Sequence, residues 1–226
     1  MADTRGEHVE SNCPFCDRKQ FEERLVAEVD GFYIIATLGQ ITDGGYVLLF
    51  PKGHISCMGV LSEEQAVKMF SISAEIAAVL LEEYVNRPSE FLPLTAFEHG
   101  IVGQTVKHAH FHILPAAFNL TPKISRDFLG TFIEQIELME LQSRYKEHPR
   151  PYLYWVSGAD VDDSVKRNYT AIERVCWNPP APAQYLRVIA AEALGRPERA
   201  NWRTMDPELD KQLWSETVRR LKPYFA

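Results

Sequence analysis

The chain lacks several features that would assign it to a large class of proteins. No window holds the run of about 20 apolar residues that a membrane span needs, so we expect no membrane partner. The 24 basic residues are outnumbered by 31 acidic ones, for a formal net charge of −7. Nucleic-acid binders normally present a basic face, so we expect no nucleic acid partner. A phosphate-bearing ligand would need a local pocket that overcomes the negative field.

The start of the sequence has little apolar character. MADTRGEHVESNC holds no apolar h-region, so we expect no secretory signal and a cytoplasmic protein. We also expect residues 1–12 to be disordered. Only four cysteines occur, too few to suggest a disulfide-stapled fold at this size. There is no internal repeat, and the composition is that of a globular protein, with 46% apolar and 24% charged residues.

The first half of the chain has the pattern of strands around one long helix. Ser62 and the following Glu-Glu-Gln form a helix-start signature, and we expect this helix to end near Pro88, which prevents its continuation. This order predicts an α+β fold with a mostly antiparallel sheet over residues 13–118. The predicted strands are residues 24–37, as a hairpin turning at Asp30 and Gly31, then 46–51, 91–100 and 105–114.

The second half, residues 119–226, predicts an α/β extension of unassigned role. Helices are expected at residues 124–146, 183–195 and 206–225, and strands at 151–158 and 169–177. Arg187 and Arg203 could bind an anion or form surface ion pairs. Most of its aromatic residues are core candidates, and one of them could stack on a base: Tyr152, Tyr154, Trp155, Trp177, Trp202 and Trp214.

Cys13 and Cys16 form a Cys-x-x-Cys pair. This spacing suits a metal knuckle or a redox pair. A redox motif is expected after a strand and at the start of a helix, and no strand pattern precedes this pair. Metal binding is therefore the first interpretation, redox chemistry the second, and two unconnected thiols the third.

His108, His110 and His112 stand at alternate positions. In a strand, alternate side chains share one face, while Ala109, Phe111 and Ile113 form an apolar opposite face. Three interpretations are open: a metal site, phosphate chemistry in which one neutral imidazole attacks phosphorus, or a polar face exposed to solvent.

The loop ahead of the histidines favours the phosphate interpretation. Gly103 lets backbone approach a ligand closely. Gln104 and Thr105 offer an amide and a hydroxyl that can bind phosphate oxygens without adding charge.

The stretch GQTVKHAHFHILP, residues 103–115, resembles the signature of the histidine triad (HIT) superfamily. That signature is His-x-His-x-His and two apolar residues, preceded by Gly-Gln-Thr/Ser-Val. GYVLLFPKGHISCMGVLSEE, residues 45–64, resembles the family's strand that ends in a Pro-Lys-x-His turn before the long helix. The NCPFC pair resembles the Cys-x-x-Cys of many bacterial members. The resemblance covers residues 13–118 and implies a HIT-like catalytic domain there.

The resemblance also implies residue roles. His110 is the nucleophile that forms a nucleotidyl-histidine, with its second ring nitrogen held by the carbonyl of His108. His112 stabilises charge on the phosphate, and Gln104 and Thr105 contact the phosphate or the leaving atom. In the galactose-1-phosphate uridylyltransferase branch the third histidine is glutamine, so His112 favours hydrolysis.

Members with the cysteine pair hold a structural zinc, and the resemblance assigns Cys13, Cys16, His54 and His108 as its ligands. These four have the composition of a closed tetrahedral site. No organic cofactor is implied. From the residues alone, His54 could equally be a surface histidine in a turn.

The sequence departs from the family pattern in two places. The asparagine that helps to bind ribose is missing near Thr37 and Leu38. His99 is an additional histidine, and either it or Glu98 could line the pocket. The other interpretation is a local hydrogen bond in a turn.

Two functions follow from these patterns. The leading hypothesis is a hydrolase or nucleotidyl transferase that cleaves a phosphorus–nitrogen or phosphoric anhydride bond at the α-phosphate. Its substrate would be a nucleotide-containing small molecule, a nucleoside phosphoramidate or a dinucleoside polyphosphate. The alternative is a non-catalytic nucleotide-binding module that contacts a protein through its C-terminal half. The family usually pairs two half-sheets, so we expect a homodimer.

Overall fold

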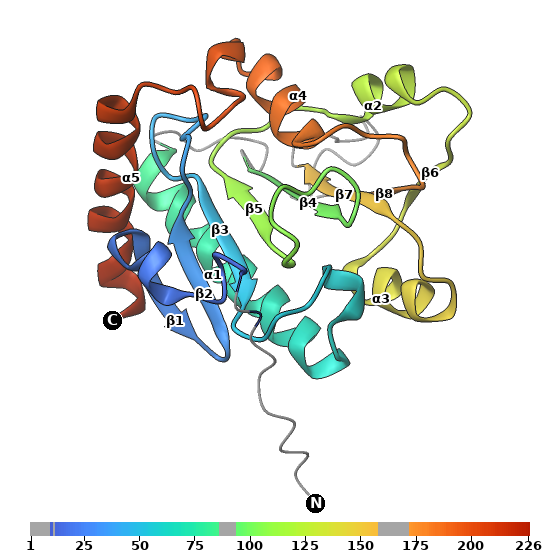
Figure 1. Ribbon diagram of the computed structural model, residues 1–226, viewed down its shortest axis with the longest axis horizontal. Coiled ribbons are helices and arrows are strands. Elements are labelled where there is room, and N and C mark those ends of the chain that lie inside the picture. Colours follow the sequence, from blue (N-terminus) through green and yellow to red (C-terminus); the bar gives the residue numbers. More distant parts are fainter. Residues whose placement is uncertain (1–9, 11, 86–93, 158–171) are drawn as a thin grey trace, which may run out of the picture.

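A computed structural model describes residues 10, 12–85, 94–157 and 172–226. At its centre is an eight-stranded sheet in the order β1-β2-β3-β5-β4-β7-β8-β6 (Figure 1). Each neighbouring pair in it is antiparallel, which confirms the predicted α+β class. The strands are β1 Leu25–Val29, β2 Phe32–Ala36, β3 Val47–Pro51, β4 Thr95–Gly100, β5 Phe111–Leu114, β6 Ile133–Gln135, β7 Tyr152–Ser157 and β8 Ile172–Trp177. The helices are α1 Glu63–Tyr84, α2 Thr121–Asp127, α3 Leu138–Glu147, α4 Tyr185–Ala193 and α5 Pro207–Leu221.

Local sequence signals set the first hairpin and the long helix. Asp30 and Gly31 have φ angles of 48° and 88°, the left-handed pair that a tight two-residue hairpin between β1 and β2 requires. At the start of α1, the Ser62 side chain accepts the Gln65 N–H, and the Gln65 side chain accepts the Ser62 N–H. This capping box begins the helix one residue after Ser62.

The C-terminal half extends the same sheet. β7 pairs with β4 along its full length, and β8 and β6 follow it outward. The edge of β4 that does not face β5 is therefore filled by the chain's own β7. The division at residue 118 and the homodimer both stay predictions. The predicted disorder of residues 1–12 falls largely on residues 1–9 and 11, which lie outside the described residues.

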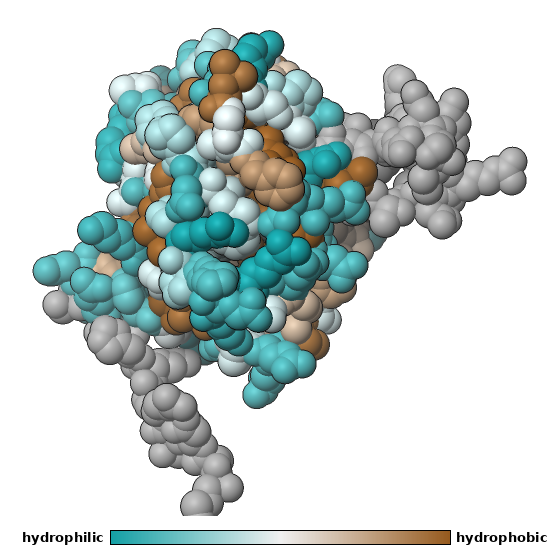
Figure 2. Space-filling view, turned by 90° about the vertical axis from the view of Figure 1, so that its right-hand side faces the viewer, coloured by the Kyte–Doolittle hydropathy of each residue, from teal (hydrophilic) through white to brown (hydrophobic). Residues whose placement is uncertain are grey.

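Helices cover both faces of the sheet (Figure 1). One apolar core joins α1 and α3 to the strands, with Met69, Ile76 and Leu141 among its members. A second core on the opposite face joins α2 and α4 to β4 and β7. α5 packs across β1 and β2 and against α1. The face drawn in Figure 2 carries hydrophobic residues scattered among hydrophilic ones. Within the described residues, no helix combines the length and apolar character needed to cross a bilayer.

Two predicted elements were wrong in part. The single helix expected at residues 124–146 is three elements: α2, the short strand β6 and α3. Gly130, at φ 86°, separates α2 from β6, and β6 is recruited by pairing with β8. The strand expected at residues 105–114 is only Phe111–Leu114. Residues 104–110 form an irregular approach to it, so His108 and His110 precede the strand.

Candidate active site

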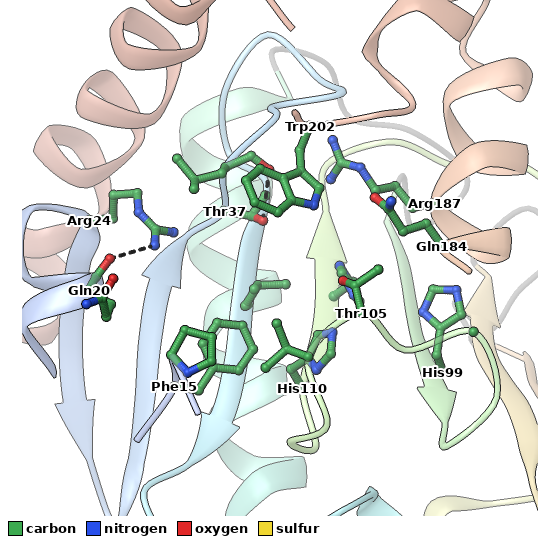
Figure 3. Close-up of a pocket in the computed structure, with 16 residues that line it drawn as sticks. Phe15, Gln20, Arg24, Thr37, His99, Thr105, His110, Gln184, Arg187 and Trp202 are labelled. Carbon is green, nitrogen blue, oxygen red and sulfur yellow. Dashed lines mark hydrogen bonds between the residues drawn. The ribbon is translucent and has the colours of Figure 1, made fainter. Parts of the chain in front are cut away.

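The three histidines of the motif take two different directions. His112 lies within β5, paired with Leu48 on β3 and Phe97 on β4. His110 and His112 both line a cavity of about 230 Å³ (Figure 3), and their ring centroids are 5.0 Å apart. His108 turns instead toward the cysteine pair. Phe111 and Ile113 face the core against α1, as predicted.

His110 is held in one tautomer. Its Nδ1 lies 2.6 Å from the backbone carbonyl of His108. A carbonyl can only accept, so Nδ1 carries the hydrogen and Nε2 keeps its lone pair. Burial lowers the pKa of His110, against the raising effect of that hydrogen bond. The side chain is therefore a neutral imidazole with a free nitrogen at the cavity.

His112 is oriented by Tyr46 and Phe97. The Tyr46 hydroxyl lies 2.6 Å from Nδ1 of His112, and the Phe97 ring stacks on the imidazole with centroids 4.5 Å apart. Burial raises the pKa of Tyr46 to about 12, so the phenol keeps its proton and can donate it to Nδ1. In that arrangement the Nε2–H of His112 is the donor available at the cavity.

His99 also lies in the cavity wall, whereas Glu98 points to the other side of β4. His99 is 3% exposed, and its Nε2 accepts the Leu186 N–H across 2.9 Å. Burial lowers its pKa to about 3, so it is neutral with its hydrogen on Nδ1. Glu98 accepts hydrogen bonds from the Met58 N–H and the Tyr152 hydroxyl.

The loop before the motif contributes Gly103 and Thr105 to the cavity. Gly103 has a φ of 77°, and a Cβ there would lie 2.8 Å from the Pro182 carbonyl. Gln104 is not one of the cavity's lining residues: its amide Nε2 donates to the Ser56 carbonyl at 2.8 Å. Its predicted contact with phosphate therefore stays a prediction.

Cys13, Cys16, His54 and His108 come together as the resemblance implied, and their four ligand atoms lie within 4.8 Å of one another. The Sγ to Nδ1 distances are 3.5 Å for Cys13–His108, 3.7 Å for Cys16–His108 and 3.4 Å for Cys16–His54. A tetrahedron with bonds of about 2.0–2.3 Å has edges of roughly 3.3–3.8 Å. The four residues therefore fit a tetrahedral metal ion.

The outer nitrogens of both histidines support this fit. Nε2 of His108 lies 2.8 Å from the Pro51 carbonyl, and Nε2 of His54 lies 2.8 Å from a Glu10 carboxylate oxygen. Each partner holds the hydrogen on Nε2 and turns an unprotonated Nδ1 toward the cluster, as metal-binding histidines require. The other two cysteines, Cys57 and Cys176, are buried away from this cluster.

The cysteine pair also shapes the cavity. Phe15, between the two cysteines, lines the cavity, stacks on Phe50 with centroids 4.5 Å apart and meets the His110 ring edge-on at 5.3 Å. A metal bound by Cys13 and Cys16 would fix Phe15 against the histidine. Sequence reasoning missed Phe15, although its place between two predicted ligands was a usable signal.

The C-terminal half completes the cavity with Gln184, Arg187 and Trp202 (Figure 3). Arg187 was weighed as an anion ligand or a surface ion pair, and it is only 3% exposed. Gln184 carries no sequence signal and was missed, as were Gln20 and Arg24 on the opposite wall. Thr37 and Leu38, where the ribose-binding asparagine is missing, also line the cavity.

Comparison with known proteins gives a family match in the first half of the chain and structural matches of varying extent. The family model described as "HIT domain" matches residues 18–119. A HIT family protein from Bacillus subtilis is 26% identical, with a TM-score of 0.40, and the match covers 47% of this chain and 74% of that one. A protein from Streptococcus mutans UA159 is 24% identical, with a TM-score of 0.42 and coverages of 52% and 78%. A GalT-like protein from Arabidopsis thaliana is 12% identical, with a TM-score of 0.43 and coverages of 77% and 84%. The resemblance seen in the motifs is thus confirmed by a match of the HIT domain model to residues 18–119.

Proposed function

We propose that this protein is a nucleotidyl hydrolase or transferase that works through a nucleotidyl-His110 intermediate. The observation that carries the proposal is the 2.6 Å hydrogen bond between Nδ1 of His110 and the His108 carbonyl. It leaves an unprotonated Nε2 on a buried, neutral imidazole at a cavity wall. A nucleophile activated in this way needs no separate general base.

The first step joins Nε2 of His110 to the α-phosphorus and breaks the bond to the leaving group, which departs with the electron pair. The hydrogen stays on Nδ1 and keeps its hydrogen bond to the His108 carbonyl. The carbonyl dipole thereby stabilises the positive charge that the ring acquires. In the second step, water attacks the same phosphorus, the N–P bond breaks and the nucleoside monophosphate leaves. His110 regains its lone pair, and the proton lost by water passes to solvent or to the departed group.

Two further side chains serve the phosphate in this scheme. His112 offers its Nε2–H, and Thr105, in the loop before the histidines, offers a hydroxyl at the cavity. Both are neutral donors, which can stabilise charge that develops on phosphate oxygens. His112 is fixed between Tyr46 and Phe97, so little reorganisation accompanies the reaction.

We also propose that Cys13, Cys16, His54 and His108 hold a structural zinc. The metal would have no contact with the phosphate. It would anchor the N-terminal segment to the residue two positions before the nucleophile and keep Phe15 against His110. Its contribution is therefore to the position of the site rather than to the reaction.

The test is covalent trapping. The wild type is incubated with adenosine phosphoramidate and with diadenosine polyphosphates, AMP is measured, and the quenched protein is analysed by intact mass and peptide mapping. His110→Ala should abolish both AMP release and the adenylyl adduct. The matched control is His148→Ala, at an exposed histidine at the end of α3, which should keep both. AMP release that survives in His110→Ala would overturn the mechanism. Binding without turnover by the wild type across a nucleotide panel would favour the binding module instead.

A further inference from the structure

The two sides of the cavity differ in chemistry. On one side of His110 lie the aromatic ring of Phe15 and the polar side chains of Gln20 and Arg24. On the other lie His99, Gln184 and Arg187, which are polar or charged. Figure 3 shows Phe15 and His99 on opposite sides of His110, with Gln184 and Arg187 above His99. Each side therefore carries one arginine, and the two differ in their surroundings: Arg24 has the charge of Asp210 near it, whereas Arg187 stands among neutral polar groups.

Arg187 is a buried cation whose described partners are uncharged. Its Nε donates to the Ala200 carbonyl at 2.8 Å, and its Nη2 donates to the carbonyls of Gly39 and, at 3.1 Å, Arg199. These bonds use Nε and Nη2, and the guanidinium also lies over the neutral Tyr46 ring, 5.5 Å from its centroid, and interacts with the Tyr46 hydroxyl. Burying a charge without a counter-charge costs free energy. An anion bound beside Arg187 would supply that counter-charge.

The neighbouring arginines show the contrast. Arg196 and Arg199 both form ion pairs with Asp43. Among the described residues, no carboxylate pairs with Arg187. The buried Asp210 accepts the N–H groups of Gly39 and Gln40, and its charge acts on Arg24.

The groups beside Arg187 also suit an oxyanion. The hydrogen of neutral His99 is on Nδ1, because Nε2 accepts the Leu186 N–H. Gln184 has a buried Oε1 that lacks a hydrogen-bond partner among the described residues. An amide turned by half a circle presents its Nε2 donors at the same place. The wall can thus offer a guanidinium, an imidazole N–H and an amide to one ligand.

We propose that Arg187, His99 and Gln184 form a second phosphoryl subsite, which takes the phosphoryl group next to the α-phosphate that His110 attacks. This inference rests on the proposed function and narrows it, because it selects nucleoside diphosphate conjugates and dinucleoside polyphosphates over phosphoramidates. The C-terminal half then supplies specificity: α4 begins at this wall and carries Arg187.

The phosphoryl group can come from two sources. It is either the β-phosphate of the leaving group or free inorganic phosphate that replaces water in the second step. In the second case a phosphate oxygen attacks the phosphorus of nucleotidyl-His110, the N–P bond breaks, His110 regains its lone pair and a nucleoside diphosphate leaves. The guanidinium serves both cases, since it binds a phosphoryl oxyanion through charge-assisted hydrogen bonds.

The experiment compares diphosphates with monophosphates. Affinities for ADP, AMP, UDP and UMP are measured by calorimetry for the wild type, Arg187→Met, Arg187→Lys and the control Arg196→Met. Arg187→Met should weaken diphosphate binding by about tenfold more than monophosphate binding. Arg187→Lys should recover part of that preference, and Arg196→Met should keep it. Equal losses for both ligand classes, or no loss, would overturn the subsite. Melting temperatures show whether each variant is folded.

Turnover separates the two sources. Products from diadenosine tetraphosphate are followed by phosphorus NMR with and without inorganic phosphate. If the wild type converts the adenylyl group into ADP only when inorganic phosphate is present, and Arg187→Met does not form this ADP, the subsite is assigned to free phosphate. If Arg187→Met cleaves diadenosine tetraphosphate more slowly than the wild type and inorganic phosphate changes neither rate nor products, the subsite is assigned to the leaving group. If the wild type shows no turnover and no adduct, the proposed function fails, while the calorimetric comparison still decides whether the subsite exists.

Discussion

The backbone N–H of Leu186 donates to Nε2 of His99 across 2.9 Å. This single bond joins the first turn of α4 to β4, two elements far apart in the chain. It also fixes the tautomer of a histidine that lines the cavity. The C-terminal half is therefore connected directly to the wall of the cavity, and the acceptor nitrogen of His99 makes this bond possible.

Replacing His99 tests this connection. His99→Ala leaves the buried Leu186 N–H without an acceptor and should destabilise the protein by about 1–3 kcal/mol, beyond the loss of packing. His99→Gln places an amide oxygen near the position of Nε2 and should restore a large part of that loss. Denaturant unfolding of the three proteins measures both effects. Equal stability of His99→Ala and the wild type would contradict this account of the bond.

Gly103 is a further point at which the two halves approach closely, beside the cavity. Its φ of 77° is unfavourable for other residues, and a Cβ would lie 2.8 Å from the Pro182 carbonyl and 3.0 Å from Cδ2 of His99. Gly103→Ala should reduce nucleotidyl transfer by tenfold or more, because the wall near His99 must move, and should cost about 1–3 kcal/mol of stability.

Gly130 provides the matched control. It has a similar φ of 86°, but a Cβ there would meet no atom within 4 Å. Gly130→Ala should therefore show the cost of the backbone conformation alone, with the rate of adduct formation unchanged. If both variants lose activity equally, crowding at Gly103 is not the cause.

The sequence predicted those parts of the site whose chemistry is local. His108, His110 and His112 lie within five residues, and their spacing with the preceding Gly-Gln-Thr was enough to identify the motif. The metal cluster could be assigned because the resemblance supplied the His54 and His108 partners. The residues alone left that assignment open.

The rest of the site depends on tertiary structure. Arg187 reaches the cavity because β7 pairs with β4 and α4 packs on the same face of these strands, and no motif in the sequence indicates that pairing. Arg187 in particular has the sequence surroundings of an ordinary helix residue. The strand β6 was missed for the same reason: three residues become a strand only because β8 lies beside them.

Metal removal should weaken the N-terminal part of the site. The wild type should contain one metal ion per chain by elemental analysis, identified as zinc. Cys16→Ser should contain well under one, because three ligands hold zinc less tightly than four. Chelation and Cys16→Ser should both lower the melting temperature and slow adduct formation, since Phe15 loses its anchor beside His110.

Cys57→Ser is the control for this experiment. Cys57 is buried but lies outside the four-residue cluster, so its variant should keep a full metal content even if its stability falls. Glu10→Gln should retain metal with about tenfold weaker affinity, because Glu10 orients His54 from outside the cluster. Wild-type protein with a metal content far below one per chain would argue against the four-ligand site.

The free energy of unfolding should depend on pH, and above pH 7 its change should report the titration of Glu98. This carboxyl is fully buried with the Met58 N–H at 2.7 Å and the Tyr152 hydroxyl at 2.6 Å, and burial raises its pKa to about 8 against those hydrogen bonds. The folded state therefore holds a proton that the unfolded chain releases near pH 4.5. Its stabilising contribution is complete below that pH and is lost as the pH rises toward 8.

The buried histidines act in the opposite direction. Burial lowers the pKa of His99, His110 and His112 below 6.5, so the unfolded chain binds more protons in acid and stability rises as the pH increases to about 7. Above pH 7 these residues are neutral in both states, and we assign the fall in stability between pH 7 and 8.5 to Glu98, with Glu173 as the other carboxyl whose pKa burial raises. Glu98→Gln cannot ionise and should flatten that fall. Glu64→Gln, at an exposed residue paired with Lys68, should leave it unchanged. Urea unfolding at half-unit steps measures the curves, and a fall above pH 7 that persists in Glu98→Gln would show that another group carries it.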